Sequence, residues 1–294
     1  MSQNKKIFVT GVTGNQGGSV ARALLSKGHQ VLGLTRNTSS DTAKHWTNLG
    51  VELIQGDFLN PDQWIDAIKG ADGLFAMTTP FEEGMDKETE QGIKLTDVAK
   101  KAGIKHLIYT SVANANLNTG IPHFDSKYEV EKYLQQSGLN HTIVAPVFFM
   151  DNALAPWMLP GLQAGNLSLP LPGTTPLQQV SVEDIGAFVS LLFEHGESVY
   201  GKRFDIAGDE LTGPNMASVL TFASGCNIQY QGFPTEVLRK QNEDMALMFE
   251  WFDKYGYTVN IDELKLKFPE MHWHRYDEWA MKQDWKVLQC RKAA

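Results

Sequence analysis

Hydrophobic and polar positions alternate along the first half of the chain in a regular order. Short apolar runs are followed by longer segments in which apolar residues recur at the spacing of a helix. This alternation predicts parallel strands joined by helices that cover both faces of the sheet. The predicted strands span residues 7–9, 31–34, 51–54, 74–77, 107–109, 142–145 and 204–206. The predicted helices span about 17–27, 86–101 and 126–136, and one more opens at Asn60-Pro61.

The second half of the chain is less regular. Prolines interrupt residues 154–176, which are predicted to be loop. Ser181 and Asp184 have the spacing of a capping box for a helix to about residue 194, so Asp184 is interpreted first as a cap and only second as functional. We expect an α/β protein with a doubly wound parallel Rossmann sheet and a smaller, mostly helical C-terminal lobe. The predicted Rossmann domain comprises residues 1–152 plus about 176–199, and the lobe comprises about 153–175 and 200–294.

A glycine-rich turn joins the first predicted strand to the first predicted helix. Gly11, Gly14 and Gly17 have the spacing of a dinucleotide-binding loop, and the flanking strand and helix supply the context that this motif requires. Glycines let the backbone approach a pyrophosphate, and the helix N-terminus presents unpaired N–H groups to the anion. A glycine-rich turn that binds nothing is the alternative. The residues predicted to contact the cofactor here are Gly11, Val12, Thr13, Gly14, Asn15 and Gln16.

The second predicted strand ends in Thr35-Arg36-Asn37, where the adenine ribose of a dinucleotide would lie. No acidic side chain stands there to accept hydrogen bonds from a free 2′-hydroxyl, whereas the Arg36 guanidinium is suited to a phosphate. We therefore expect NADP(H) rather than NAD(H), in contact with Arg36 and Asn37; a solvated surface arginine is the alternative. The residues predicted to lie near the adenine and the middle of the cofactor are Asp57, Phe58, Thr78 and Thr79.

Composition limits the classes of protein to which the chain can belong. A net charge of −8 offers no electrostatic attraction for nucleic acid or an anionic membrane. The longest apolar run, residues 143–150, is too short to span a bilayer, and the glycine loop interrupts any signal-peptide pattern. Cys226 and Cys290 show no pairing motif, which fits a reducing compartment rather than a disulfide framework. We expect a cytoplasmic protein that contacts neither nucleic acid nor membrane.

Several motifs taken together resemble one family. They are Gly11-x-x-Gly14-x-x-Gly17-Gly18, Thr35-Arg36-Asn37, Gln55-Gly56-Asp57, Tyr109-Thr110-Ser111, His123-Phe124-Asp125-Ser126-Lys127 and Pro146-x-x-Phe149-x-x-Asn152. This set resembles the NmrA-like branch of the atypical short-chain dehydrogenases, most closely the NADPH redox sensors of the HSCARG type. The resemblance covers most of the chain, strongly to about residue 200. It implies a smaller lobe that closes over the nicotinamide, with Pro146, Val147 and Phe149 in contact with the cofactor.

The resemblance implies two kinds of function. Some NmrA-like proteins reduce quinones, dyes or phenolic ethers with NAD(P)H, whereas others bind the dinucleotide and pass its redox state to a protein partner. We favour an NADPH-dependent reductase of a small carbonyl, quinone or enone substrate, because Lys127 and several aromatic or apolar groups could line the site. A non-catalytic sensor that regulates a protein partner is the alternative. Either kind of protein could form a homodimer.

The catalytic motif departs from that of typical short-chain dehydrogenases. Their Tyr-x-x-x-Lys motif supplies a proton donor and a lysine that lowers its pKa, but here His123 occupies the tyrosine position and only Lys127 is kept. We expect Lys127 to hydrogen-bond the nicotinamide ribose, with a solvated lysine as the alternative. His123 could donate a proton to the substrate, because imidazole titrates near neutral pH. A histidine at the helix start that points elsewhere is the favoured alternative.

Two features of the second half have structural interpretations. His272 and His274 are two residues apart, and histidines at this spacing share a face only on a strand. No acidic pattern accompanies them, so we expect surface or core histidines rather than metal ligands. The aromatic-rich stretch at residues 248–257 is interpreted as core packing of the lobe, with a substrate wall as the alternative.

Overall fold

The computed structural model describes residues 4–289. Cys226 is disulfide-bonded, which contradicts the expectation of unpaired cysteines, and Cys290 lies outside the described residues. The chain divides into two compact units. Unit 1 comprises Met1–Asn118, Pro122–Ala145 and Ile185–Asp205, and unit 2 comprises Thr119–Ile121, Pro146–Asp184 and Ile206–Ala294. Each unit is described by itself below.

Unit 1 is built on a seven-stranded sheet in the order β10-β6-β5-β4-β1-β2-β3. Strand β1 pairs in parallel with both β2 and β4, and the parallel pairs β2–β3, β4–β5 and β5–β6 extend the sheet on either side. The order of the strands reverses between β1 and β4, which is the topological switch of a doubly wound sheet. The predicted fold class is therefore confirmed. The strands are β1 (Lys6–Val9), β2 (Gln30–Thr35), β3 (Glu52–Gln55), β4 (Gly73–Ala76), β5 (His106–Thr110), β6 (His141–Pro146) and β10 (Lys202–Ile206).

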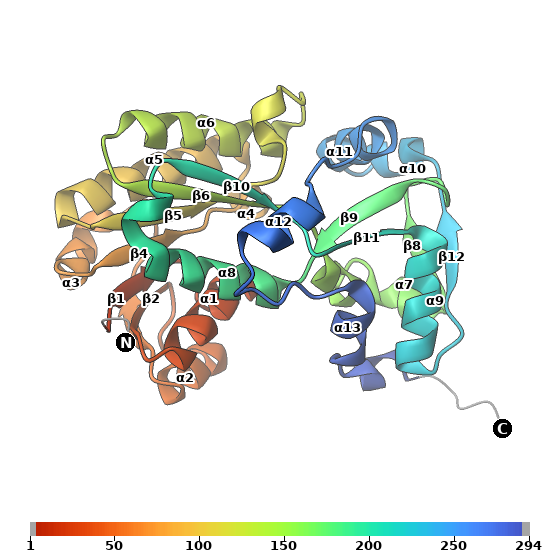
Figure 1. Ribbon diagram of the computed structural model, residues 1–294, viewed down its shortest axis with the longest axis horizontal. Coiled ribbons are helices and arrows are strands. Elements are labelled where there is room, and N and C mark those ends of the chain that lie inside the picture. The colour runs from red at the N-terminus through yellow and green to blue at the C-terminus, as the bar shows by residue number, and fades with distance from the viewer. Residues whose placement is uncertain (1–3, 290–294) are drawn as a thin grey trace. The chain divides into compact units, whose positions relative to one another are not determined.

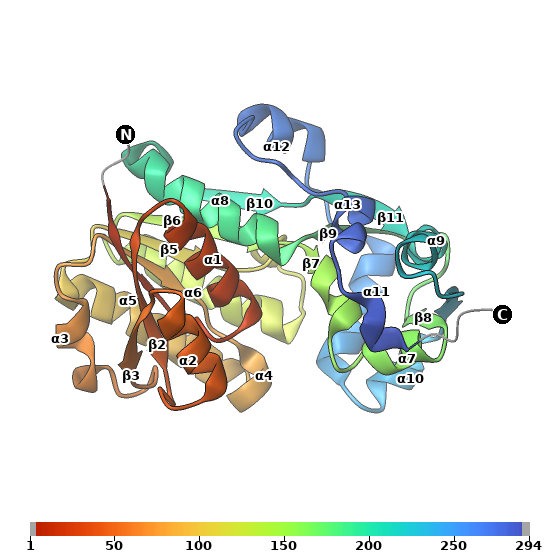
Figure 2. The ribbon, with the colours of Figure 1, turned by 90° about the horizontal axis from the view of Figure 1, so that it is seen from below.

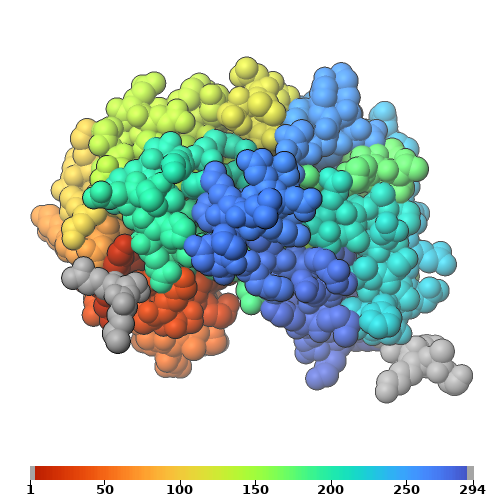
Figure 3. Space-filling model, in the orientation of Figure 1, coloured from red at the N-terminus to blue at the C-terminus, as the bar shows by residue number. Residues whose placement is uncertain are grey.

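Helices cover both faces of this sheet (Figure 1). On one face, α1 and α8 approach so closely that a Cβ on Gly186 would lie 2.3 Å from Ser19 Oγ. In the space-filling view, the green-to-teal residues of α8 lie at the surface of unit 1 (Figure 3). Helices α5 and α6 cover the opposite face. The helical elements are α1 (Asn15–Ser26), α2 (Asp41–Asn48), η1 (Pro61–Gln63), α3 (Ile65–Ile68), α4 (Pro80–Glu83), α5 (Met85–Ala102), η2 (Ala115–Leu117), α6 (Pro122–Gln136), α8 (Val182–His195) and η4 (Gly196–Val199).

Two of the predicted helices differ in extent from the structure. The helix predicted to open at Asn60-Pro61 is a short turn, η1, followed by the single-turn α3. Helix α6 begins at Pro122, earlier than predicted, because proline suits the first position of a helix. His123 therefore lies in the first turn of α6, and Lys127 follows it on the same helix.

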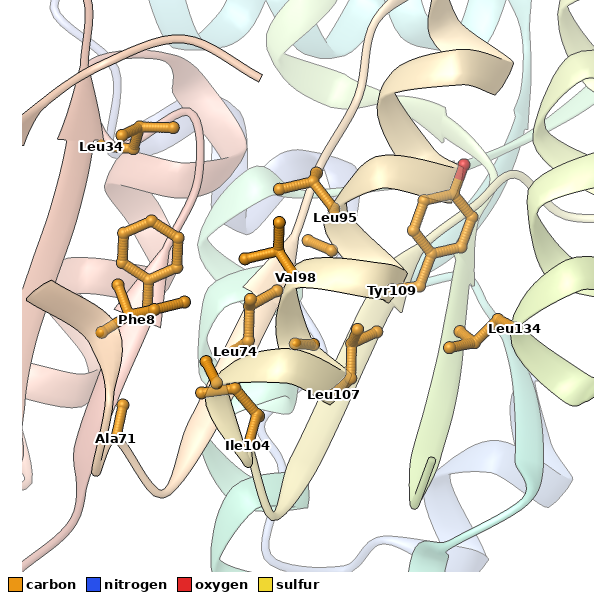
Figure 4. Packing of buried hydrophobic residues seen from close by; sticks show 14 of the residues in the cluster. Phe8, Leu34, Ala71, Leu74, Leu95, Val98, Ile104, Leu107, Tyr109 and Leu134 are labelled. Atoms are coloured by element: carbon orange, nitrogen blue, oxygen red, sulfur yellow. The ribbon is translucent and has the colours of Figure 1, made fainter. Parts of the chain in front are cut away.

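The α5 face of the sheet holds a continuous hydrophobic core. Leu74 of β4 and Leu107 of β5 pack beneath Leu95 and Val98 of α5, and all four side chains are almost fully buried (Figure 4). Leu95 and Val98 are three positions apart, so they lie on the same side of the helix. This packing fixes α5 over β4 and β5, and therefore fixes the residues at the start of α5 relative to the carboxyl ends of those strands.

Unit 2 contains two small sheets. In one, β9 pairs antiparallel with β11 and parallel with β7; in the other, β8 and β12 are parallel. The strands are β7 (Phe148–Phe149), β8 (Asn166–Leu169), β9 (Pro176–Val180), β11 (Asp209–Thr212) and β12 (Gln229–Gly232). The helical elements are η3 (Met150–Leu154), α7 (Leu159–Gln163), α9 (Gly213–Ser224), α10 (Thr235–Arg239), α11 (Glu243–Lys254), α12 (Ile261–Lys267), α13 (Tyr276–Met281) and η5 (Trp285–Leu288); most are visible in a second view (Figure 2).

The predicted loop at residues 154–176 contains both a helix and a strand. Pro160 lies in the first turn of α7, where its missing N–H leaves no hydrogen bond unmade, so the proline does not prevent the helix. In the aromatic-rich stretch, Phe249 and Phe252 are buried, with ring centroids 6.2 and 6.5 Å from that of Phe148. No helix among residues 4–289 has the length and apolar character needed to cross a bilayer.

Only half of the predicted capping box forms at the start of α8: Ser181 caps the helix, but the Asp184 carboxylate binds His274. Ser181 Oγ accepts a hydrogen bond from Glu183 N at 3.1 Å rather than from Asp184 N. The Asp184 carboxylate instead accepts hydrogen bonds from the backbone N of His274, at 2.8 Å, and from the ring Nδ1 of the same residue. His274 is buried, whereas the His272 side chain is 69% exposed. The capping pattern failed in part because the partner of Asp184 lies 90 residues away.

Candidate dinucleotide site

The glycine-rich loop turns tightly between β1 and α1. Gly11 has a left-handed backbone with φ of 63°, and its carbonyl accepts a hydrogen bond from Gly14 N at 2.9 Å. A Cβ on Gly17 would lie 2.3 Å from the Gly11 carbonyl oxygen, so no larger residue fits there without moving the loop. Gly14 is the N-cap residue of α1 and provides no side-chain cap. The loop therefore presents backbone N–H groups at a helix N-terminus, as an anion requires.

Hydrogen bonds tie this loop to the carboxyl ends of three strands. Thr10 Oγ1 accepts a hydrogen bond from Met77 N at 2.7 Å, which joins the end of β1 to the end of β4. Thr110 Oγ1, at the end of β5, donates to the Gln16 side-chain oxygen at 2.8 Å. The predicted loop residues and the predicted Thr78 and Thr79 are thus brought to one edge of the sheet, where ligands of such sheets bind.

Arg36 already has a partner in this structure. Its guanidinium forms a two-pronged pair with Glu82 of α4, Nη1 to Oε2 at 2.9 Å and Nη2 to Oε1 at 3.2 Å. The two side chains are 73% and 55% exposed, and an exposed pair of this kind stabilises by less than about 1 kcal/mol. A phosphate can therefore replace the carboxylate at small cost. Asn37 Oδ1 accepts a hydrogen bond from Ser39 N at 2.9 Å, which closes the turn after β2.

Asp57 and Phe58 make local structural contacts after β3. Asp57 Oδ1 accepts hydrogen bonds from the backbone N of Leu59, at 2.8 Å, and of Asn60, at 2.9 Å. The side-chain hydrogen bond from Asn60 is the main cause that lowers the pKa of Asp57, so this carboxyl is ionised at neutral pH. Phe58 is partly buried against the core cluster. These contacts fix the loop in which the predicted adenine contacts lie.

Lys127 of α6 forms a buried ion pair with Glu88 of α5. Lys127 Nζ lies 2.7 Å from Glu88 Oε1 and 3.2 Å from the carbonyl oxygen of Thr78, at the end of β4. The Glu88 side chain is fully buried and also accepts hydrogen bonds from Ser126 Oγ, at 2.6 Å, and Thr78 Oγ1, at 3.2 Å. We call these four residues, Thr78, Glu88, Ser126 and Lys127, the Glu88 cluster. Lys127 is 13% exposed, so it is not the solvated lysine of the alternative interpretation.

Glu88 was not among the candidate residues. Its sequence signal is a charged residue on the apolar side of α5, at helical spacing from Gln91, Gly92 and Leu95, which are all buried. A charge on such a face is rarely buried unless it is paired. The hydroxyl of Tyr109 lies 3.3 Å from Thr78 Oγ1, and burial raises the pKa of Tyr109 well above its usual value.

His123 is buried in the first turn of α6. Its ring centroid lies 4.8 Å from that of Phe124 and 6.1 Å from that of Phe81 on α4. His123 and Lys127 are one helical turn apart on the same side of α6. Thr79 is the N-cap of α4, accepting a hydrogen bond from Phe81 N at 3.4 Å.

Ser111, directly after β5, belongs to a second buried network. Ser111 Oγ donates to Glu131 of α6, whose side chain is fully buried. Arg203 of β10 binds the same carboxylate, Nε to Oε2 at 3.0 Å, and also donates to the carbonyl oxygen of Val112 at 2.9 Å.

The three candidate residues at and after the end of β6 belong to unit 2. Val147 N donates to the carbonyl oxygen of Ile206 at 3.1 Å, and Phe149 of β7 is paired with Val180 of β9. Pro146 is the last residue of β6. Their contact with a cofactor stays a prediction.

Comparisons with known proteins agree with this geometry. The chain is 28% identical over 273 residues to an NmrA-like family domain-containing protein of Dictyostelium discoideum, covering 86% of this chain and 89% of that one. It is 31% identical over 251 residues to the NmrA-like family domain-containing oxidoreductase malD of Malbranchea aurantiaca, covering 76% of this chain and 74% of that one.

Two solved structures have the same fold at low sequence identity. The NADPH-dependent quinone oxidoreductase QOR2 of Escherichia coli, complexed with NADPH, matches with a TM-score of 0.77 and 23% identity over 93% of this chain and 98% of its own. The negative transcriptional regulator NmrA, in complex with NADP, matches with a TM-score of 0.75 and 24% identity over 95% of each chain. These matches do not single out the redox-sensor branch. The NmrA-like family model matches residues 3–280, and the chain belongs to the NmrA-like family.

Proposed function

We propose that the protein is an NADPH-dependent reductase of a small carbonyl, quinone or enone substrate. The observation that carries the proposal is Lys127, a nearly buried ammonium group held by the Thr78 carbonyl oxygen after the carboxyl end of β4. Similarity to a family oxidoreductase and to a quinone oxidoreductase complexed with NADPH supports the reductase class. The cytoplasmic location and the small-molecule substrate are part of the same proposal.

Different residues of the chain would bind different parts of the cofactor. NADPH, when bound, supplies the hydride. Arg36 would exchange Glu82 for the 2′-phosphate in a charge-assisted pair, and the N-terminus of α1 would face the pyrophosphate. Lys127 gives two of its three N–H groups to Glu88 and Thr78, which leaves one for a ribose hydroxyl. His123 would supply the proton for carbonyl reduction; a quinone product can take its protons from water.

Cofactor preference tests the assignment with two opposing variants. NADPH should bind more tightly than NADH, and Arg36→Ala should weaken NADPH binding by about 10-fold to 100-fold, which corresponds to about 1.5–3 kcal/mol. Glu82→Gln should tighten NADPH binding by several-fold, because it removes the competitor for Arg36. Equal affinities of the wild-type protein for the two cofactors, measured by calorimetric titration, would refute the NADP(H) assignment.

Turnover tests the reductase class. The protein should oxidise NADPH in the presence of quinones, aldehydes or enones, followed by absorbance of the reduced nicotinamide. His123→Phe should leave NADPH affinity unchanged and slow carbonyl reduction by about 10²-fold, with loss of one limb of the pH–rate profile. Unchanged carbonyl kinetics in His123→Phe would remove this residue from the mechanism.

A sensor is the second candidate function, and one observation favours it. The usual tyrosine is replaced by His123, so one part of the usual proton-transfer machinery is changed. A sensor of the HSCARG type would respond to NADPH by shifting between conformations or oligomers, such as monomer and homodimer, that a protein partner distinguishes. A change of sedimentation with NADPH and no turnover across the substrate panel would support the sensor over the reductase.

A further inference from the structure

Unit 1 contains a cavity at the end of the sheet opposite to the glycine-rich loop. Its volume is about 460 Å³, within the range of pockets that hold small ligands. It lies at the amino ends of β1, β4 and β5, whereas the loop follows the carboxyl end of β1, so the two sites are separated by the length of the strands. We call it the basal cavity. The residues that line it are Asn4, Lys5, Asp72, Lys105, His106, Phe193 and Tyr200.

The lining of the basal cavity contains one more ammonium group than carboxylate. Asp72 is fully engaged: Oδ1 lies 2.8 Å from Lys105 Nζ, and Oδ2 accepts a hydrogen bond from Lys6 N at 2.9 Å. Lys5 Nζ donates to the carbonyl oxygen of Phe193, and within residues 4–289 no carboxylate lies at ion-pair distance from it. The two lysines and one aspartate of the lining therefore have a net charge of +1. A ligand with one negative charge neutralises this net charge. A ligand with two negative charges would exceed it and would be repelled by the Asp72 carboxylate.

His106 lines the basal cavity, and its imidazole has one nitrogen that can accept a hydrogen bond. Its Nε2 lies 2.8 Å from Thr142 Oγ1, and this hydroxyl donates its single hydrogen to the carbonyl oxygen of Val199 at 2.8 Å. The hydrogen between Nε2 and Thr142 must therefore come from the imidazole, which leaves Nδ1 with a lone pair. Burial, with contributions from Lys5 and His141, lowers the pKa of His106 to about 3, so the ring is neutral.

Two aromatic side chains hold the His106 ring in place, and the partly exposed one, Tyr200, gives the cavity an aromatic surface. The Phe193 centroid lies 5.4 Å away in an edge-on arrangement, and the Tyr200 centroid lies 4.7 Å away. Phe193 is buried, and Tyr200 is partly exposed. A ligand that fits this surface has a flat apolar part in addition to its polar groups.

We propose that the basal cavity binds a small aromatic monocarboxylate that carries a hydroxyl or amino group. The carboxylate pairs with Lys5, the ring lies against Tyr200, and the hydroxyl or amino group donates to His106 Nδ1. This site is separate from the proposed NADPH site and does not depend on the proposed reductase activity.

Three probes test the proposal on the full-length wild-type protein by calorimetric titration. 3-Hydroxybenzoate should bind, benzoate should bind about 10-fold more weakly because it lacks the donor, and neutral 3-hydroxybenzyl alcohol should bind at least 10-fold more weakly because it lacks the charge. Saturating NADPH should leave these affinities unchanged. Absence of 3-hydroxybenzoate binding at millimolar concentration, or loss of binding in the presence of NADPH, would overturn the proposal, and neither result bears on NADPH turnover.

Two variants assign the binding to the cavity, with a surface lysine as the control. Lys5→Met should weaken 3-hydroxybenzoate by at least 10-fold, whereas Lys132→Met, at an exposed lysine of α6 paired with Glu129, should not change it. In His106→Phe, benzoate and 3-hydroxybenzoate should bind equally. An unchanged affinity in Lys5→Met, or an unchanged preference for the hydroxyl in His106→Phe, would refute the assignment.

Discussion

The Glu88 cluster leads to a sharp prediction about stability. Lys127→Met removes the only cation within ion-pair distance of Glu88 among the described residues, and the Glu88 side chain is fully buried. A buried carboxylate that loses its partner costs about 3–5 kcal/mol, because its desolvation is no longer offset by the attraction of the ammonium. Ser126 and Thr78 still donate to the carboxylate, so we expect the lower end of this range.

The matched controls are Glu88→Gln and the double variant Glu88→Gln/Lys127→Met. The double variant removes both charges and should recover most of the stability that Lys127→Met loses, so the double-mutant cycle should give a coupling of about 2–4 kcal/mol. Urea denaturation at equilibrium gives the free energy of unfolding of each protein. A loss below about 1 kcal/mol in Lys127→Met, or additive effects of the two changes, would refute the reasoning.

The same set of proteins separates folding from binding at Lys127. If Lys127 contacts the nicotinamide ribose, the double variant should be stable and still bind NADPH more weakly than Glu88→Gln by about 10-fold. Equal NADPH affinities in these two proteins would place Lys127 outside the cofactor site and leave it a purely structural residue.

The remaining predictions concern other parts of unit 1. Gly17→Ala should abolish detectable NADPH binding, because its Cβ would lie 2.3 Å from the Gly11 carbonyl oxygen and would move the loop. Calorimetric titration measures the binding, and circular dichroism checks that the protein stays folded. His106 has a native pKa of about 3 against 6.5 when unfolded, so only the unfolded chain binds the proton between these values. Stability should therefore fall as the pH is lowered from about 6.5 toward 3, by at most about 1.4 kcal/mol per pH unit, and a His106→Phe variant should lack this part of the slope in urea titrations at pH 7 and 5. Arg203→Met should lower the free energy of unfolding by about 3 kcal/mol, since it removes the cation that pairs with the buried Glu131, whereas Arg203→Lys should recover part of the loss. Equal losses in both variants would contradict a role for charge.

The fold was predictable because its signal is local and repeated. Most strands of the central sheet contain a short apolar run, such as Ile7–Val9 or Leu107–Tyr109, and the longer crossovers show helical spacing. The glycine loop was predictable for the same reason, since Gly11, Gly14 and Gly17 lie within one turn and their spacing alone defines it. Boundaries were less accurate, as the start of α6 at Pro122 shows.

The charges that organise the candidate site were not predictable in the same way. Lys127 could be singled out by resemblance, but its partner Glu88 lies 39 residues earlier on another helix. Asp184 has the spacing of a helix cap, but its carboxylate binds His274, which is 90 residues away. The position of Arg36 in the sequence indicated a phosphate site, but it did not indicate that the Glu82 carboxylate competes with the phosphate for the guanidinium. Pairings of this kind depend on which helices the sheet brings side by side, so they follow from the tertiary structure and not from spacing.

The Arg36–Glu82 pair also has an evolutionary consequence. Under the proposed function, only a cofactor with a 2′-phosphate has to displace Glu82 from Arg36. The Arg36–Glu82 pair therefore weakens the binding of NADPH but not of NADH. A single substitution on the exposed helix α4 can then shift the preference between the two cofactors, while every residue of the recognised nucleotide-binding motifs stays the same. In related proteins, a substitution at position 82 would therefore change cofactor preference without any change in the glycine-rich loop or at the end of β2, the segments from which that preference is usually predicted.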